Sequence, residues 1–268
     1  MRSSGIYVYG VLMNYVPPKY QIFFQDLGLV DYKEAWDYQE KRLKEIVEER
    51  EELKKTGYDD AIPQKQVFLF CEHPHVFTLG KSGNANNLLI NSDFLKKIDA
   101  TFYRINRGGD ITYHGPGQIV GYPIIDLDSL RLKIKDYIWM LEEAVIRLLS
   151  VYNIRGIRIE GATGVWLGSP VTVKARKICS IGVRVSNRVT MHGFAFNVNT
   201  NLSYFNYINP CGFTDKEVTS LRKETGRELN INEIKTRLKF LLADIFNIEW
   251  KNGTLGTDEK ELDHKRTS

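Results

Sequence analysis

Cys211 is the residue of this sequence that is best suited to nucleophilic chemistry. It lies in the stretch INPCGF, residues 208–213, where a Pro-Cys-Gly turn is an unusual place for a cysteine that only fills a core. The next four residues, Thr214–Glu217, have the spacing of a capping box and predict that a helix begins there. The partial positive charge of a helix N-terminus stabilises a thiolate just before it. We therefore expect a reactive thiol at Cys211.

The second candidate is the glycine-rich stretch RGGDITYHGPGQ, residues 107–118. Its glycines supply turns, but turns alone do not require Arg107, Tyr113 and His114 as well. The stretch joins two strand-like segments and matches neither GxGxxG nor GxxxxGK(S/T), so we do not expect a phosphate cradle at a helix N-terminus. Glycines let a ligand lie against the backbone and use its N–H groups as donors. We interpret the stretch as a binding loop whose ligand class is open.

The stretch CEHPH, residues 71–75, contains three potential metal ligands in Cys71, His73 and His75. The proline between the histidines interrupts strand geometry, and no second ligand cluster follows at zinc-site spacing. We expect a strand end followed by a turn there, and no metal site. Cys71 and Cys179 are interpreted as small core residues.

Helices and strands in mixed order must position these residues. Apolar spacing predicts three helices, over 32–55 (ended by Gly57), around 137–149 and around 234–245. Strands are predicted at 66–70, 76–79, 101–105 and 118–125, with a hairpin turning around Ser186-Asn187. Because strands and helices do not alternate regularly, the predicted fold is α+β, a mixed sheet with helices packed on one side.

Length and composition indicate one domain. The chain has 268 residues, 43% of them hydrophobic, which suits a single core over residues 1–250, and residues 251–268 are expected to form a mobile tail. A formal net charge of +4 is too small to favour a nucleic-acid partner. Three cysteines indicate a reducing compartment, so we expect a cytoplasmic protein. No segment approaches the roughly eighteen apolar residues of a membrane span, and we expect no membrane partner.

Several motifs in register resemble those of the lipoyl (octanoyl) transferases. They are RGGDITYHGPGQIVGYPIIDL (107–127), KICSIG (177–182), MHGFAFNVN (191–199) and INPCG (208–212), preceded by FQDLGLVDYKEAWDYQ (24–39) and EHPHVFTLG (72–80). The resemblance covers roughly residues 20 to 220. It implies the architecture that this family shares with the biotin and lipoate protein ligases.

The resemblance implies an acyltransferase. The family moves an octanoyl group from octanoyl-acyl carrier protein to a lysine on lipoyl domains of 2-oxoacid dehydrogenases or on the glycine cleavage H protein, and it uses no ATP or other cofactor. Its catalytic cysteine, in the NPCG motif, corresponds to Cys211, and its catalytic lysine, which opens the KxxS(I/L)G stretch, corresponds to Lys177. This agrees with the residues themselves, since an ammonium favours a nearby thiolate and a neutral amine can accept a proton. We expect a monomer.

The resemblance also implies a set of substrate-contacting residues. They are Arg107, Gly108, Gly109, Asp110, Ile111, Thr112, Tyr113, His114, Ser180, Ile181, Gly182, Gly193, Phe194 and Ala195. Small residues with an interleaved Ile and Phe suit a thin aliphatic chain. Backbone N–H groups near Gly182 or Cys211 are candidates for holding an oxyanion.

Three other functions stay open at this point. An ATP-dependent lipoate or biotin protein ligase shares the architecture, but it would bind an acyl-adenylate and would not need a reactive cysteine. A cysteine hydrolase could pair Cys211 with His114 or His192, but no third residue that orients the histidine is identified. A non-catalytic protein that binds lipoyl domains or acyl carriers would have no use for both Lys177 and Cys211.

Overall fold

The computed structural model describes residues 6–8, 11–13, 20–57, 62–169, 173–209 and 217–251. Cys211 lies outside these ranges, and so does the expected tail except for Lys251, the last residue of a strand. The helices in these ranges are α1 (Tyr32–Lys55), α2 (Ser92–Lys97), α3 (Ile134–Val151), α4 (Leu221–Thr225) and α5 (Ile231–Phe246), with 3₁₀ turns at Ala85–Asn87 and Leu202–Tyr207.

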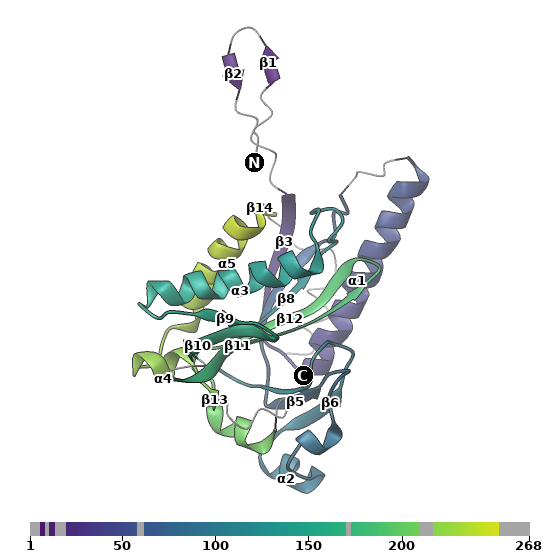
Figure 1. Ribbon diagram of the computed structural model, residues 1–268. Coiled ribbons are helices and arrows are strands. Elements are labelled where there is room, and N and C mark those ends of the chain that lie inside the picture. The colour runs from purple at the N-terminus through teal and green to yellow at the C-terminus, as the bar shows by residue number, and fades with distance from the viewer. Residues whose placement is uncertain are drawn as a thin grey trace.

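A nine-stranded mixed sheet forms the centre of the molecule (Figure 1). Its strands in spatial order are β14 (Ile248–Lys251), β3 (Tyr20–Leu29), β4 (Val67–Glu72), β8 (Gln118–Ile124), β12 (Val189–Asn197), β11 (Val173–Ser186), β10 (Ala162–Ser169) and β9 (Ile157–Ile159), and β13 (Glu217–Val218) also pairs with β11. The pairs β14–β3, β3–β4 and β11–β13 are parallel, and the others are antiparallel. The predicted α+β class with a mixed sheet is confirmed.

Two smaller sheets complete the described strands. Strand β5 (Val76–Leu79) lies between β6 (Thr101–Arg104) and β7 (Ile111–His114), below the main sheet in Figure 1. The stretch 107–118 is therefore not loop throughout, because its centre forms strand β7. Strands β1 (Ile6–Val8) and β2 (Val11–Met13) pair with each other.

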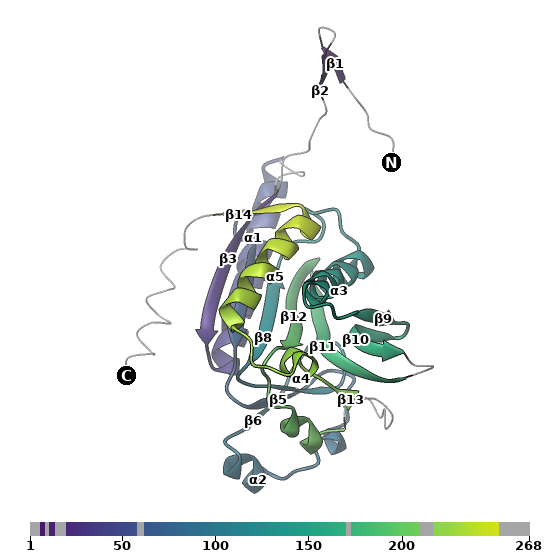
Figure 2. The ribbon, with the colours of Figure 1, turned by 90° about the vertical axis from the view of Figure 1, so that its left-hand side faces the viewer.

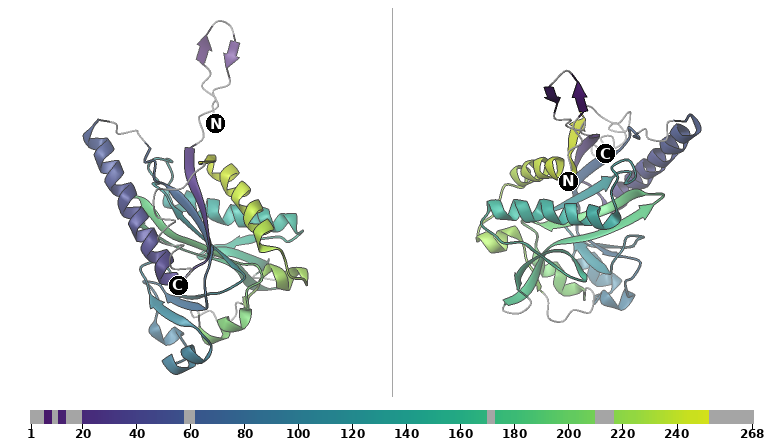
Figure 3. Two further views of the ribbon diagram at one scale, coloured as in Figure 1. Left: turned by 180° about the vertical axis from the view of Figure 1, so that it is seen from behind. Right: turned by 45° about the horizontal axis from the view of Figure 1, so that its top comes forward.

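Helices cover both faces of the main sheet, so the prediction that they pack on one side is wrong. Strand β4 explains why: Phe68 and Phe70 join the core beneath α3 and α5, whereas Leu69 and Cys71 join the core beneath α1. A strand with apolar residues at every position buries both faces. Figure 2 shows α3 and α5 side by side over the sheet, and Figure 3 shows α1 apart from them.

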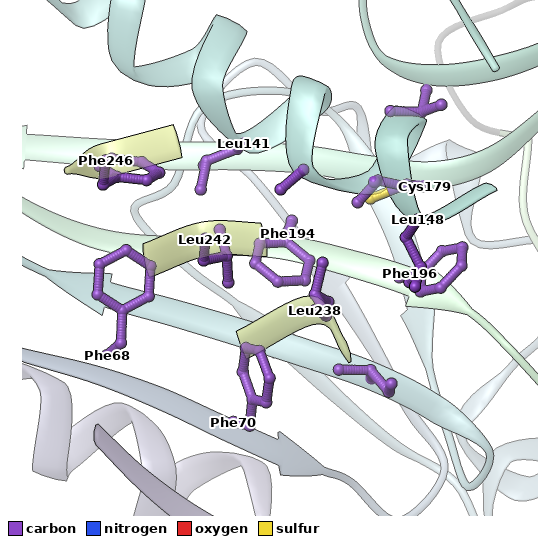
Figure 4. Close-up of a cluster of buried hydrophobic side chains, with 14 of the residues drawn as sticks. Phe68, Phe70, Leu141, Leu148, Cys179, Phe194, Phe196, Leu238, Leu242 and Phe246 are labelled. Carbon is purple, nitrogen blue, oxygen red and sulfur yellow. The ribbon is translucent and has the colours of Figure 1, made fainter. Parts of the chain in front are cut away.

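The core beneath α3 and α5 is the larger one (Figure 4). Aromatic side chains of β4 and β12 meet leucines of both helices there: Phe68, Phe70, Phe194, Phe196, Leu141, Leu148, Leu238 and Leu242. Phe246 closes this core at the end of α5, with its ring centroid 5.4 Å from that of Phe68. Both helices are thereby held against the strands that carry the candidate site.

The predicted hairpin is confirmed between β11 and β12. Ser186 pairs with Val189, and the two residues between them, Asn187 and Arg188, both have positive φ, at 48° and 67°. Two consecutive positive φ values are those of a type I′ turn, whose twist matches that of the flanking strands. The turn sets the register in which Gly182 faces Gly193.

The prediction that a helix begins at Thr214–Glu217 is wrong. Glu217 and Val218 form strand β13, in parallel register with Arg176 and Lys177, and residues 210–216 lie outside the described ranges. The next helix, α4, begins at Leu221, where the Ser220 side chain accepts a hydrogen bond from the N–H of Lys223. The helix on which the expected activation of Cys211 was based therefore does not begin at Thr214–Glu217. A capping-box spacing can be overridden when the same residues complete a sheet edge.

Candidate active site

A cavity of about 410 Å³ lies along strand β11. Its lining includes Lys177 and all the expected substrate-contacting residues except Tyr113, namely Arg107, Gly108, Gly109, Asp110, Ile111, Thr112, His114, Ser180, Ile181, Gly182, Gly193, Phe194 and Ala195. Segments far apart in the chain thus meet around one space. Small side chains and backbone form much of its wall, which suits a thin ligand.

Glycines allow the loop before β7 to lie directly on the sheet. A Cβ atom on Gly182 would lie 2.9 Å from the carbonyl oxygen of Gly108, and one on Gly193 would collide with the carbonyl oxygen of Gly121. The N–H of Gly108 donates to the carbonyl oxygen of Val183 at 2.9 Å. The loop is therefore fixed to β11 by a backbone contact that a side chain at Gly182 would crowd, whereas Gly193 lets β12 lie close to β8.

Arg107 is buried and holds the loop from beneath. Its Nη2 donates to the carbonyl oxygen and to Oγ1 of Thr78, at 2.8 and 3.0 Å, and its Nη1 donates to the carbonyl oxygen of Gly108 at 3.0 Å. The guanidinium thus connects β5 to the loop while it also lines the cavity. Its planar donors suit several fixed acceptors at once.

His114 lines the cavity as a buried, neutral imidazole. Its Nδ1 lies 2.8 Å from Oε1 of Gln118, to which it donates, and its ring stacks on Tyr32 at 5.8 Å between centroids. Burial, reinforced by electrostatic interactions with His73, Arg107 and His192, holds the pKa of His114 well below its usual range. With its pKa lowered and its Nδ1–H bonded to Gln118, His114 is a weak base near neutral pH and serves as part of the cavity wall.

His192 is a second neutral imidazole in the cavity wall. Its Nε2 lies 2.9 Å from Oδ1 of Asn106, and the amide of Asn106 donates to Glu40 at 3.2 Å, so His192 is the donor in this contact. Burial, with Arg107 and Arg184 nearby, lowers the pKa of His192 to about 3. An amide oxygen orients each histidine, as in Cys–His–Asn triads, but the lowered pKa of both rings disfavours either one as the general base of a hydrolase.

Lys177 lies at the other end of the cavity from His192. Lys177 pairs with Trp166 of β10, whereas His192 pairs with Val183, six residues further along β11 and so roughly 20 Å away. The Lys177 Nζ donates to the carbonyl oxygen of Thr163 at 3.2 Å and lies 4.6 Å from the Trp166 ring centroid. The ammonium is therefore oriented both by a carbonyl dipole and by an aromatic face.

The segment that contains Cys211 rejoins the sheet beside Lys177. Val218 pairs with Lys177, the N–H of Thr219 donates to the Lys177 carbonyl oxygen at 2.9 Å, and Glu217 and Val218 line the cavity. Cys211 itself lies outside the described residues.

Tyr113 faces away from the cavity. Its hydroxyl lies 2.8 Å from Nδ1 of His75, and its ring stacks on Tyr204 at 4.9 Å between centroids. Tyr113 belongs to the small core with Phe77 and Phe205. Ile111, Thr112 and His114 of β7 line the cavity, whereas Tyr113 packs against His75 and Tyr204.

The two other cysteines are fully buried, as predicted, and burial raises the pKa of each thiol. His73, also buried, donates from Nδ1 to the Val30 carbonyl oxygen at 2.8 Å and accepts at Nε2 from the Tyr122 hydroxyl at 2.7 Å. Burial lowers the pKa of His73 to about 4. Within the described ranges, no three His, Cys, Asp or Glu residues form a group that could hold a metal ion.

Several cavity residues were not identified from the sequence. They are Tyr32, Val120, Tyr122, Ile138, Gly161, Ala162, Thr163, Trp166, Val183, Phe205, Glu217 and Val218. Strands β9 and β10, which bring Thr163 and Trp166 to Lys177, were not predicted, because glycines interrupt the alternation in ATGVWLGS. The single tryptophan of that stretch, Trp166, was the one feature of the sequence that could have indicated a buried strand there.

In the described part of the chain, no helix is both long and apolar enough to cross a bilayer.

Comparisons with known proteins agree on a family. The family model of the lipoyl protein ligase A/B catalytic domain matches residues 31–242. An octanoyltransferase of Christiangramia forsetii is 53% identical over 234 residues, covering 86% of this chain and 98% of the relative. An octanoyltransferase of Bacteroides thetaiotaomicron is 52% identical over 222 residues, covering 83% of this chain and 94% of the relative.

Solved structures show the same fold. A bipartite lipoate protein ligase of Thermoplasma acidophilum matches with a TM-score of 0.64 at 17% identity, covering 92% of this chain and 91% of that one. A lipoate-protein ligase A bound with ATP matches with a TM-score of 0.61 at 14% identity, covering 93% and 94%. The architecture expected from the resemblance is thereby confirmed. With relatives about half identical over almost their whole length, the chain belongs to the octanoyltransferases of the lipoyl protein ligase A/B catalytic domain family.

Proposed function

We propose that the chain transfers an octanoyl group from octanoyl-acyl carrier protein to a lysine of a lipoyl domain through a thioester on Cys211. The observation that carries this proposal is the position of Lys177 at one end of the cavity, beside the point where the cysteine-bearing segment rejoins the sheet. The octanoyltransferase relatives support the reaction class. Acceptors are the lipoyl domains of 2-oxoacid dehydrogenases and the glycine cleavage H protein.

The first half-reaction loads the enzyme. The Cys211 thiolate attacks the thioester carbonyl, a new carbon–sulfur bond forms, and the bond to the carrier sulfur breaks as the carrier thiolate leaves. The Lys177 ammonium stabilises the attacking thiolate and then supplies a proton to the departing sulfur. Residues that line the cavity, including Ser180–Gly182 and Gly193–Ala195, enclose the aliphatic chain.

The second half-reaction transfers the octanoyl group from the enzyme to the acceptor lysine. The neutral ε-amine of the acceptor lysine attacks the acyl-enzyme carbonyl, an amide forms, and the Cys211 thiolate leaves. Lys177, neutral after the first half-reaction, accepts the proton that the attacking nitrogen loses, so both groups return to their starting state. The acyl group arrives already activated as a thioester, so no ATP is needed.

The test is to incubate the full chain with octanoyl-acyl carrier protein in the absence of ATP. We expect intact-protein mass spectrometry to find one added octanoyl group, and peptide mapping to place it on Cys211. The adduct is absent in Cys211→Ala and retained in Cys179→Ala, the matched control for a buried cysteine. An adduct on another residue, or acylation that requires ATP and free octanoate, contradicts the proposal.

Lys177→Ala tests the second catalytic group. We expect this variant to fold but to transfer the octanoyl group at least about a hundredfold more slowly, the lower range for positioned proton transfer. Single-turnover transfer to a purified lipoyl domain measures the effect. A rate equal to that of the native chain would remove Lys177 from the catalytic pair.

A further inference from the structure

Glu142 is a buried carboxylate on the inner face of α3, 7% exposed. It lies one helical turn from Ile138, whose side chain lines the cavity, but Glu142 itself does not line it. Its Oε2 accepts a hydrogen bond from Nε of Arg158 on β9 at 3.0 Å. A buried carboxylate is costly unless it is paired, so this position calls for a reason beyond packing.

The other oxygen of Glu142 contacts the backbone that holds Lys177. Oε1 accepts a hydrogen bond from the N–H of Gly164 at 2.9 Å. The carbonyl of the same peptide unit belongs to Thr163, and its oxygen accepts the hydrogen bond from Lys177 Nζ at 3.2 Å. One peptide group therefore lies between a buried carboxylate and the proposed catalytic ammonium.

We propose that Glu142 is a positioning residue for Lys177, acting through the Thr163–Gly164 peptide. The inference rests on the catalytic role proposed for Lys177. A negative charge that accepts from a peptide N–H polarises the group and makes its carbonyl oxygen a stronger acceptor, because hydrogen bonds in a chain reinforce one another. The Lys177 ammonium is thereby held in one orientation and favoured over the neutral amine.

The surrounding residues fix this geometry. A Cβ atom on Gly164, whose φ is 120°, would collide with the carbonyl oxygen of Cys179, so the peptide passes too close to β11 for any other residue. Arg158 keeps Glu142 paired from the far side and stacks on Trp139 at 4.6 Å. The carboxylate can therefore neither rotate away from the peptide nor lose its charge partner without breaking a contact.

Glu143 offers a matched control. It is the next residue on α3 and accepts from Arg158 Nη2 at 2.8 Å, but its other partner is Arg147. Glu142→Gln and Glu143→Gln each remove one carboxylate from Arg158. Only Glu142→Gln removes a negative charge that contacts the Thr163–Gly164 peptide, which binds Lys177.

The experiment compares the two variants in the first half-reaction. The full chain is mixed with octanoyl-acyl carrier protein between pH 6 and 9, and acylation is followed by rapid quench and intact mass. We expect Glu142→Gln to acylate about tenfold more slowly than the native chain at pH 7.5. We also expect the alkaline limb of its pH–rate profile to shift to lower pH, because the Lys177 ammonium is then less stabilised by the Thr163 carbonyl oxygen. Glu143→Gln is expected to stay within about twofold of the native rate, with the native pH profile.

The outcomes separate this inference from the proposed function. If Glu142→Gln matches Glu143→Gln in rate and pH profile while Lys177→Ala is slow, the inference is wrong and the proposed function stands. A slower Glu142→Gln with an unshifted pH profile indicates a structural role and also overturns the inference. If Lys177→Ala acylates at the native rate, the proposed function fails first.

Discussion

At the scale of single residues, the cavity holds two histidines of lowered pKa away from the end that carries Lys177. His114 and His192 are kept neutral by burial, while Lys177 is oriented by a carbonyl and an aromatic ring. Imidazoles whose pKa lies well below neutral pH are weak bases there and carry little charge. The reaction proposed above therefore relies on Cys211 and Lys177 rather than on these histidines.

Buried histidines also make stability depend on pH. The pKa of His73 is about 4 in the folded chain and about 6.5 when unfolded, so between these values the unfolded chain binds the proton more readily. The free energy of unfolding should thus fall as the pH drops from about 6.5 to 4, by roughly 3 kcal/mol from this residue. Urea unfolding at pH 7.5, 6 and 5 measures the slope. In His73→Asn the slope should decrease, and an unchanged slope would assign it to other groups.

At the scale of elements, helix boundaries are where local sequence is most informative. The N-cap of α1 is Asp31, whose Oδ1 accepts from the N–H groups of Lys33 and Glu34 at 2.7 and 3.4 Å. The first residue of the helix, Tyr32, lines the cavity and stacks on His114. The cap therefore anchors both the helix and one wall of the site.

We expect Asp31→Ala to lower the free energy of unfolding by about 1 kcal/mol, because two helix N–H groups lose their acceptor. Asp31→Ser is the control, since a serine hydroxyl at the N-cap can accept the same hydrogen bonds. Denaturant midpoints of the two variants against the native chain measure the difference. Equal losses in both variants would mean that the charge of Asp31, rather than its capping geometry, is what matters.

The elements predicted from sequence are those whose pattern is local. Helix α1 was predicted with its observed bounds, and β5 likewise, because apolar spacing and flanking signals lie within the segment. Strand β7 was taken for loop, since glycines and a proline surround its four residues. The start of α4 was misplaced because β13 pairs with β11, about forty residues away in sequence.

At the scale of the whole molecule, two cores on opposite faces of the sheet hold the cavity strands in place. The core under α5 includes Phe246, 3% exposed, which contacts Phe68 of β4 and Tyr137 of α3 through edge-on ring packing. On the same helix, Phe240 is 69% exposed. The two phenylalanines therefore differ in burial while sharing a chemical type and a helix.

We expect Phe246→Ala to lower the free energy of unfolding by roughly 3–5 kcal/mol, the range for a buried aromatic side chain. Phe240→Ala should change it by no more than about 0.5 kcal/mol, as for an exposed position. Chemical denaturation monitored by far-UV circular dichroism measures both. A loss in Phe240→Ala as large as that in Phe246→Ala would show that the exposed face of α5 is covered in solution.

The sequence by itself determined the fold class, the main helices, the β11–β12 hairpin and the family motifs, because periodicity, turn chemistry and motif order are written in neighbouring residues. Only the tertiary structure decided that helices cover both faces, that Tyr113 turns away from the cavity, and that Glu142 reaches the peptide that binds Lys177. These features depend on the register of strands and on contacts between residues far apart in the chain. No local pattern encodes them, because which side of a strand faces a cavity is settled only when its partners pack against it.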